Sequence, residues 1–352
     1  MADAGYSPGG WSGRGARPRA NLLALAYFTF FAVLAALAAV VTLAGNPLDG
    51  EPSVTLTLAP RPMQPAVAVA PAGPRLVNGN LVADPALLEK TAQGSLPIIA
   101  ADGRKPMQAY ARPFDAADTR PHIAVVIGGF GLSAGATKLA LDHLPPAITV
   151  SFAPYASDLQ YWVDAARAAG HEVLVEVPME PFDFPASDPG PHTLLTSAGE
   201  KENAKRLYWA LSRATGYVGV TNLLGGRFLS EDKSIEPMLS ELNKRGLLFF
   251  DNGASARSIA AAAAERLDAP HVTGALLLDA VQNHAAIEVK LADLELQARE
   301  NGVGVASGIL YPITIQQVSE WAATLEARGF VLAPVTAVLA RHQVTAEPAP
   351  QP

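Results

Sequence analysis

The sequence predicts an α/β fold with a parallel sheet, and two repeated patterns support this. Eight short apolar runs recur between residues 121 and 342, and stretches with helical spacing separate most of them. Several helical stretches end in glycine just before the next apolar run, as in AAGHEVLV, ATGYVGV and KRGLLFF, and glycine is the usual residue after a helix. Seven or eight such units in about 220 residues favour a closed or nearly closed (β/α) barrel over an open doubly wound sheet.

The predicted strands are continuous apolar runs, as expected for a parallel sheet that is buried on both faces. They are 123–127 (IAVVI), 148–153 (ITVSFA), 172–177 (EVLVEV), 217–222 (YVGVTN), 247–251 (LLFFD), 275–279 (ALLLD), 303–307 (VGVAS) and 330–335 (FVLAPV). Helical spacing predicts helices at 158–169, 200–213, 234–245, 255–266, 285–300 and 314–328. The aromatic residues on these helices are expected to pack against the sheet. They are Tyr161, Trp162, Tyr208, Trp209 and Trp321.

Residues 22–44 (LLALAYFTFFAVLAALAAVVTLA) are uncharged and mostly apolar, and a helix of about 20 such residues crosses a bilayer. Three arginines precede this run, at 14, 17 and 19, so the positive-inside rule places residues 1–21 in the cytoplasm. We predict a single-pass inner-membrane protein whose C-terminal domain lies in the periplasm. The alternative is a cleaved signal peptide, although the apolar core of such peptides usually spans only about 7–15 residues.

The region between this helix and the barrel is rich in proline and alanine. Stretches such as APRPMQPAVAVAPAGPR predict an extended linker over residues 45–120, in which 81–100 has the pattern of one helical turn and an edge strand. The barrel domain is predicted over 121–342, and residues 343–352 are predicted to be a disordered tail.

Composition excludes several classes of function. The formal net charge of −7 gives no reason to expect a nucleic-acid partner. The chain has no cysteine, which excludes disulfides, thiolate metal ligands and a cysteine nucleophile.

In parallel α/β folds the functional site lies at the carboxyl ends of the strands. Four carboxylates stand at these positions and are the catalytic candidates: Glu176, Glu180, Asp251 and Asp279. The substrate-binding candidates at the same ends are Tyr155, Asn222, Arg227 and Tyr311.

Two of these carboxylate patterns allow specific expectations. Glu176 interrupts an apolar strand, so it either pairs with a cation such as Arg227 or points into the barrel mouth. Asp251 and Asp279 both follow apolar strands, and paired carboxylates leave glycoside hydrolysis open as a second enzymatic class.

The motifs along residues 121–340 resemble those of the divergent polysaccharide deacetylases, which are related to the NodB-type carbohydrate esterases. The matching phrases are IAVVIGGFGLS, AARAAGHEVLVEVPMEP, GYVGVTNLLGGRF, GLLFFDNGAS and ASGILYPIT before FVLAPVTAV. The resemblance implies a distorted NodB-like (β/α) barrel of seven to eight strands. It also implies that the domain acts on, or binds, an envelope polysaccharide such as peptidoglycan.

The resemblance implies a divalent metal such as zinc, held by one aspartate and two histidines, that activates water for deacetylation. The sequence departs from this pattern at each ligand. Gly128 and Gly129 stand where the family usually has an Asp-Asp pair, Leu223 replaces the histidine of an Asn-Asn-His phrase, and Glu176 stands where the family tends to have histidine. A late His-Pro is replaced within 309–312.

The seven histidines do not supply a substitute. No two of them are three to five residues apart, and only His192 is placed to reach the mouth, where a role in stabilising its loop is expected. We therefore expect no cofactor, unless Glu176, Glu180, Asp251 and His192 form a non-standard metal site.

Three functions follow as hypotheses. The first is a membrane-anchored family member without deacetylase activity that binds an envelope glycan or an envelope protein. The second is an active deacetylase or hydrolase that uses a non-standard metal or the carboxylates. The third is a structural envelope scaffold.

Overall fold

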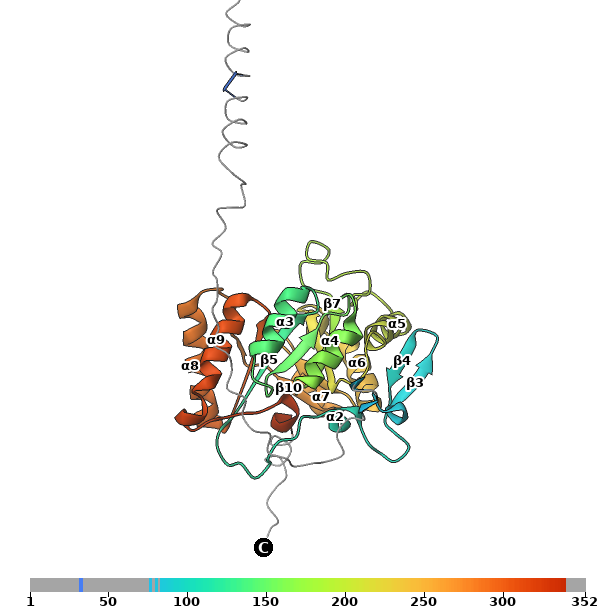
Figure 1. Cartoon of the computed structure of the whole chain (residues 1–352). Helices are drawn as coiled ribbons and strands as arrows, with labels where there is room; N and C mark the ends of the chain where they lie inside the picture. The colour runs from blue at the N-terminus through green and yellow to red at the C-terminus, as the bar shows by residue number, and fades with distance from the viewer. Residues whose placement is uncertain (1–31, 34–75, 78–79, 82, 340–352) are drawn as a thin grey trace, which may run out of the picture. The chain divides into compact units, whose positions relative to one another are not determined.

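The computed structural model describes residues 32–33, 76–77, 80–81 and 83–339 (Figure 1). The chain divides into two compact units, Met1–Pro60 and Arg61–Pro352, and all described residues except 32–33 belong to the second. The predicted membrane segment 22–44, apart from 32–33, and the predicted tail 343–352 lie outside the described residues. Within the described ranges, no helix is both long and apolar enough to span a membrane.

Parallel strands form the centre of the domain, and they follow the spatial order β10–β9–β8–β7–β6–β5–β12–β11. Their bounds are β5 (His122–Phe130), β6 (Thr149–Phe152), β7 (Val173–Met179), β8 (Gly219–Leu224), β9 (Leu248–Asp251), β10 (His271–Thr273), β11 (Leu276–Leu277) and β12 (Val303–Ile309). A further strand, β13 (Val331–Leu332), pairs with the start of β5.

The two ends of this strand series are joined by the chain itself. Only Gly274 and Ala275 separate β10 from β11; the N–H of Gly274 donates to the carbonyl of Asp251, and the N–H of Ala275 donates to that of Val305. The segment therefore bridges β9 on one side and β12 on the other, and the predicted parallel-strand barrel is confirmed in this form.

Helices follow the strands and lie outside them (Figure 1). They are α3 (Ala134–His143), α4 (Leu159–Ala168), α5 (Glu200–Leu211), α6 (Asp232–Lys244), α7 (Ala260–Arg266), α8 (His284–Asn301) and α9 (Pro312–Ala323), with short turns η2 (Phe228–Ser230) and η3 (Glu326–Arg328). The helix predicted at 255–266 begins only at Ala260. The side chain of Asp251 bonds the N–H of Gly253 and the hydroxyl of Ser258, which holds this stretch as a loop.

The expected packing of helix aromatics is confirmed for four of the five residues. Trp162, Tyr208, Trp209 and Trp321 pack against the buried core. The expectation is wrong for Tyr161, which is 65% exposed. Consecutive helix residues point about 100° apart, and in α4 Trp162 faces the core while Tyr161 faces outward.

Residues 83–120 differ from the extended linker that the sequence predicts for 45–120. They form η1 (Pro85–Leu87), an antiparallel hairpin of β3 (Leu88–Thr91) and β4 (Gly94–Pro97), and a short α2 (Pro106–Ala109). The prolines at 85 and 106 stand in first helical turns, where no N–H donor is needed. Proline density therefore does not prevent this segment from packing. Upstream, β1 (Leu76–Val77) pairs with β2 (Asn80–Leu81).

We predict that Leu96→Ala lowers the free energy of unfolding by about 2–4 kcal/mol, because Leu96 is only 1% exposed and belongs to the main core. Urea denaturation measures this change. The exposed neighbour Gln93 serves as the control, since Gln93→Ala removes no buried contact. A Leu96→Ala variant as stable as Gln93→Ala would contradict the inclusion of this hairpin in the folded domain.

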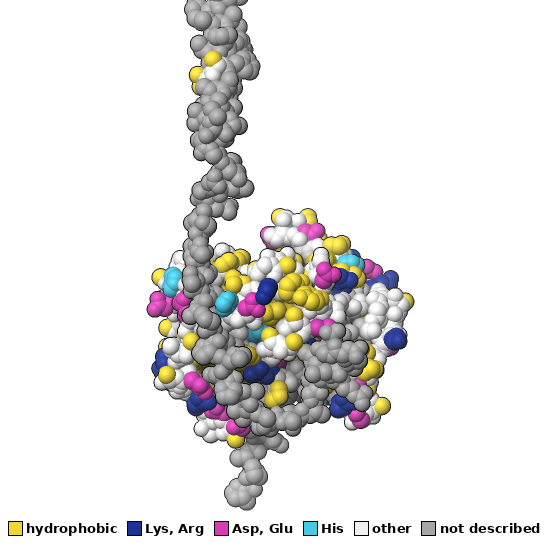
Figure 2. Space-filling view, viewed as in Figure 1, with side chains coloured by type: hydrophobic (Ala, Val, Ile, Leu, Met, Phe, Trp, Pro, Cys, Tyr) yellow, Lys and Arg dark blue, Asp and Glu magenta, His cyan; other side chains and the backbone are white. Residues whose placement is uncertain are grey.

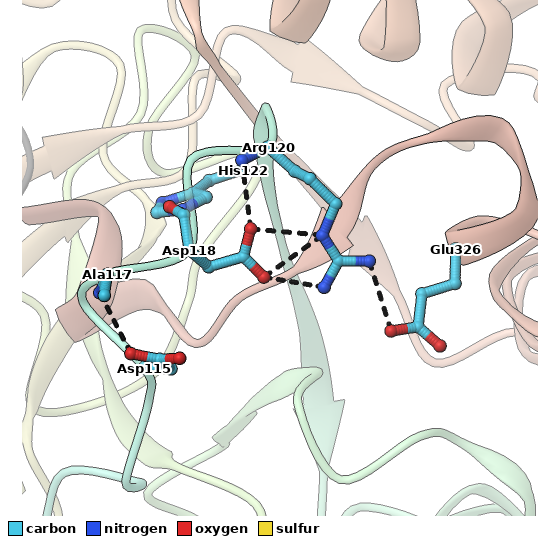
Figure 3. A network of polar contacts seen from close by, with 6 residues as sticks. All are labelled: Asp115, Ala117, Asp118, Arg120, His122 and Glu326. Carbon is cyan, nitrogen blue, oxygen red and sulfur yellow. Dashed lines mark hydrogen bonds and ion pairs between the residues drawn. The ribbon is translucent and has the colours of Figure 1, made fainter.

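A polar network lies at the amino end of β5, at the opposite end of the strand from the candidate site (Figure 3). Arg120 lies between Asp118 and Glu326, with Nη2 at 2.6 Å from Asp118 Oδ2 and Nη1 at 3.2 Å from Glu326 Oε1. The guanidinium lowers the pKa of the Asp118 carboxyl to about 2. The network joins the segment before β5 to η3 and so sets where β5 begins.

Candidate ligand-binding site at the barrel mouth

Glu176 lies in the middle of β7, and its carboxylate contacts residues near the carboxyl ends of β5 and β6. Its Oε1 accepts hydrogen bonds from the N–H of Gly129 (2.6 Å) and from the hydroxyl of Ser151 (2.9 Å), and the residue is 4% exposed. Burial raises the pKa of the Glu176 carboxyl to about 7, because the two hydrogen bonds offset only part of the lost hydration. The expected alternative of a pair with Arg227 is not found, because Arg227 pairs with Glu180.

Gly128 and Glu176 share one small space. A Cβ atom on Gly128 would lie 2.9 Å from Glu176 Oε1 and 3.1 Å from Ser151 Oγ. Gly129 has φ of +85°, which side-chain-bearing residues rarely adopt, and its N–H holds Glu176. The two glycines and Glu176 therefore form one unit, in which an Asp-Asp pair would crowd Glu176 at position 128 and strain the backbone at position 129.

Asp279 lies on the other side of the β5–β12 pair. Its Oδ2 accepts from the N–H of Ile309 (2.7 Å) and from the hydroxyl of Thr314 (2.7 Å), and Ile309 pairs with Gly128 in the sheet. Its Oδ1 is buried without a hydrogen-bond partner. Burial raises the pKa of Asp279. Two carboxyl groups whose pKa values are raised by burial thus flank the end of β5.

Asp251 and Asn222 are bound within the fold. Asp251 Oδ1 accepts from the N–H of Gly253 (3.0 Å), and its Oδ2 accepts from the hydroxyl of Ser258 (2.5 Å). Asn222 and Asn252 bond each other: Asn252 N donates to Asn222 Oδ1 (2.9 Å), and Asn222 Nδ2 donates to Asn252 Oδ1 (3.0 Å). These contacts position the loop after β9, and they leave Asp251 poorly placed to act with Asp279 on a glycosidic bond.

Glu180 and Arg227 hold the loops that follow β7. Glu180 Oε2 accepts from the N–H (2.6 Å) and the hydroxyl (2.9 Å) of Thr196, while its Oε1 lies 3.2 Å from Arg227 Nη1. Glu180 therefore has a structural partner on each carboxylate oxygen.

Two further predicted site positions are half-buried. They are Leu223, at the end of β8, and Tyr311, just before α9.

Tyr155 supports the loop over the mouth. Its hydroxyl accepts from the N–H of His192 (3.3 Å), and its ring lies 5.1 Å from that of Trp209. The His192 ring stacks on Trp209 at 3.7 Å, which confirms the loop-stabilising role expected for this histidine. The residue Gly190 lies against the Tyr155 hydroxyl, where a Cβ would approach within 2.5 Å.

A groove of about 690 Å³ opens beside Tyr155, where β5 and β6 end. It is lined by Gly131, Leu132, Ala134, Tyr155, Ala156, Ser157, Asp158, Tyr161 and Trp162. Tyr161 and Leu132 are 65% and 67% exposed. Figure 2 shows hydrophobic side chains gathered on this face of the domain, around α4.

Sequence reasoning missed Tyr161 and Ser151 as site residues. Adjacent aromatics do not signal the exposure of Tyr161, because the adjacent pair Tyr208 and Trp209 both pack against the core. A serine inside the apolar run TVSF marks the hydroxyl that bonds Glu176.

The residues at the mouth do not fit the metal that the resemblance implies. Across residues 83–339 and the short described stretches before them, no three His, Cys, Asp or Glu side chains are grouped so that they could hold a metal ion. The oxygens of Glu180 and Asp251 are bonded within the fold, and the His192 ring is stacked on Trp209. The proposed non-standard ligands are thus not brought together.

The fold defines a parallel α/β barrel-type protein whose candidate site lies near the carboxyl ends of its strands. The family model for divergent polysaccharide deacetylases matches residues 125–339, and the chain belongs to this family.

The chain is similar to the uncharacterized protein YibQ of Escherichia coli (strain K12), with 26% identity over 198 residues, covering 56% of this chain and 61% of YibQ. It is also similar to an uncharacterized protein of Haemophilus influenzae (strain ATCC 51907 / DSM 11121 / KW20 / Rd), with 22% identity over 176 residues, covering 50% and 62%. The match thus spans about six-tenths of each curated relative.

Among solved structures, the chain is similar to the uncharacterized protein ATU2773 of Agrobacterium tumefaciens C58. The two share 40% identity with a TM-score of 0.68, over 70% of this chain and 99% of that chain.

Proposed function

We propose that this protein is an inner-membrane-anchored envelope protein that binds a polysaccharide such as peptidoglycan and does not deacetylate it. The observation that carries the proposal is the pairing of Gly128 with Glu176. The Glu176 carboxylate lies beside Gly128, where it would crowd an aspartate at this position, and the left-handed φ of Gly129 disfavours a second aspartate there. Loss of the ligand histidines from the sequence supports the same conclusion.

The groove between β5, β6 and α4 supports glycan binding. The Tyr161 and Trp162 rings are 5.1 Å apart and nearly perpendicular, and Tyr161 is largely exposed. Aromatic faces stack on the C–H faces of sugar rings, and a cleft lined by aromatic and polar side chains suits a carbohydrate chain. The side chain of Asp158 lies in the groove and does not cap α4, so its carboxylate is available to accept hydrogen bonds from sugar hydroxyls.

A second candidate function is hydrolysis without a metal, and the raised pKa values of Glu176 and Asp279 favour it. A carboxyl that stays protonated near pH 7 suits a general acid. Glu176→Gln keeps the acceptor oxygen for Gly129 and Ser151 but removes the acid. Any hydrolysis that Glu176→Gln abolishes would therefore support this candidate.

We predict that Tyr161→Ala reduces binding to peptidoglycan at least about tenfold, because it removes the exposed stacking face. Co-sedimentation of the full chain with purified peptidoglycan measures this. Gln108→Ala on α2 is the control, since Gln108 is exposed and α2 packs at the amino end of β9. Unchanged binding by Tyr161→Ala would contradict the groove as the glycan site. Tyr155→Ala is less suitable, because Tyr155 also supports the loop at His192.

A further inference from the structure

A cavity of about 270 Å³ lies between helices α5 and α6, on the outside of the strands. It shares no lining residue with the groove beside Tyr155. Part of its lining is apolar and 4% exposed or less: Leu194, Leu207, Phe228 and Met238. Small-molecule sites usually measure about 300–1,000 Å³, so this cavity suits one small chemical group and not a long chain.

The charged residues that line the cavity balance each other. Glu200 and Glu241 contribute two carboxylates, and Lys233 and Lys244 contribute two ammonium groups. Because the lining carries two charges of each sign, it favours an uncharged ligand over an anion or a cation.

Ser234 brings one hydrogen-bonding group to the cavity wall. The residue is 8% exposed and lines the cavity, and in the described part of the chain its hydroxyl has no hydrogen-bond partner. A buried hydroxyl costs free energy unless a partner bonds it. The Ser234 hydroxyl is therefore available to a ligand in the cavity.

Pro237 makes a second group available, through the backbone of α6. It lies inside this helix, and both Pro237 and Lys233 line the cavity. In an α-helix the N–H of residue 237 would donate to the carbonyl of Lys233, but proline has no N–H. The Lys233 carbonyl thus lacks its usual helical donor and can accept a hydrogen bond from a ligand.

We propose that this cavity binds a secondary amide, whose carbonyl accepts from the Ser234 hydroxyl and whose N–H donates to the Lys233 carbonyl. The donor and the acceptor of a trans amide point in opposite directions. The two groups on α6 are displaced along the helix in the same way, because a helical carbonyl points to the following turn and a side chain leans toward the preceding one. The apolar substituent of the amide then lies against Leu207 and Phe228.

The N-acetyl group of a sugar and the peptide bond both have this chemistry, and the test separates these two sources. The full chain, purified in detergent, is titrated with N-acetylglucosamine, with N-acetylalanine N-methylamide and with glucose, and binding is followed by saturation-transfer difference NMR. We expect saturable binding of at least one amide probe and at least about tenfold weaker binding of glucose. The amide probe that binds more tightly identifies the source. No saturable binding of either amide probe, or equal binding of glucose, would overturn the proposal.

Two variants of α6 assign the binding to this cavity. Ser234→Ala removes the hydroxyl, and Pro237→Val restores an N–H for the Lys233 carbonyl while keeping a side chain of similar size. Both should fold, since one loses a single hydroxyl and the other loses a proline from a helix interior. Each should weaken binding of the amide probe about three- to tenfold, the loss expected for one hydrogen bond.

Ser197→Ala is the control, because Ser197 is exposed and does not line the cavity. If Ser234→Ala and Pro237→Val both bind the amide probe as tightly as Ser197→Ala does, the cavity is not the amide site. The proposal does not rest on the glycan groove. The two sites share no residue, so loss of peptidoglycan binding in Tyr161→Ala and loss of amide binding in Ser234→Ala are separate outcomes.

Discussion

Gly128→Asp is expected to lower the free energy of unfolding by about 3–5 kcal/mol. The new Cβ would lie 2.9 Å from Glu176 Oε1 and 3.1 Å from Ser151 Oγ, so the buried Glu176 carboxyl must shift away from its hydrogen-bond partners. The added carboxyl would also stand beside a second carboxyl that is already buried, and two such groups cannot both ionise cheaply. The destabilisation should therefore be larger at pH 8 than at pH 5. Urea denaturation at the two pH values measures both effects.

Gly135→Asp is the matched control for this substitution. A Cβ at Gly135 meets no atom within 4 Å, and the residue lies in the first turn of α3, where an acidic side chain is favourable. We expect Gly135→Asp to change stability by less than about 0.5 kcal/mol. The double variant Gly128→Asp/Glu176→Ala should recover part of the loss. If Gly128→Asp is as stable as Gly135→Asp, Glu176 does not fill the space beside Gly128.

The stability of the domain is expected to fall as pH rises from about 4.5 to about 7. Burial raises the pKa of Glu172 and of Glu176 from 4.5 to about 7 in the folded chain. The unfolded chain releases these protons at lower pH than the folded chain does. Their contribution is therefore complete below about pH 4.5 and is lost as pH approaches 7, by at most about 3 kcal/mol for each group.

Glu176→Gln tests this pH dependence with little disturbance of the structure. A single oxygen of Glu176 accepts both hydrogen bonds, so the amide oxygen of glutamine can replace it. The variant should lose about half of the fall in stability between pH 4.5 and 7, and it should exceed the parent in stability at pH 8. Glu172 is not replaced, because its two oxygens accept from Arg112 and Thr336 and an amide would meet a donor. An unchanged pH profile would contradict the raised pKa of Glu176.

The strands, and the end of the sheet at which the candidate site lies, were predictable because they depend on local sequence patterns. The eight apolar runs correspond to strands β5–β9 and β11–β13. The short strand β10 was not predicted, because its three residues, His271–Thr273, carry no apolar run. A helical turn and one edge strand were expected within 81–100, but the second strand of the hairpin was not, because its place depends on the burial of Leu96 in the main core.

The candidate site was predictable in position and less so in the role of each residue. The strand-end rule located Glu176, Asp279 and Tyr155. It did not show that Glu180, Asp251 and Asn222 are bound to Thr196, Ser258 and Asn252. These partners come from loops distant in sequence, and which side chains meet depends on how the loops fold. The exposure of Tyr161 likewise depends on which way α4 is turned.

The most direct test of the account is the mass of an N-acetylated chito-oligosaccharide recovered after it has bound to the full chain. The account predicts that the oligosaccharide binds, that Tyr161→Ala weakens this binding, and that the bound fraction keeps all of its acetyl groups. Loss of acetyl groups in the presence of the parent chain, but not of Glu176→Gln, would contradict a binding function without catalysis.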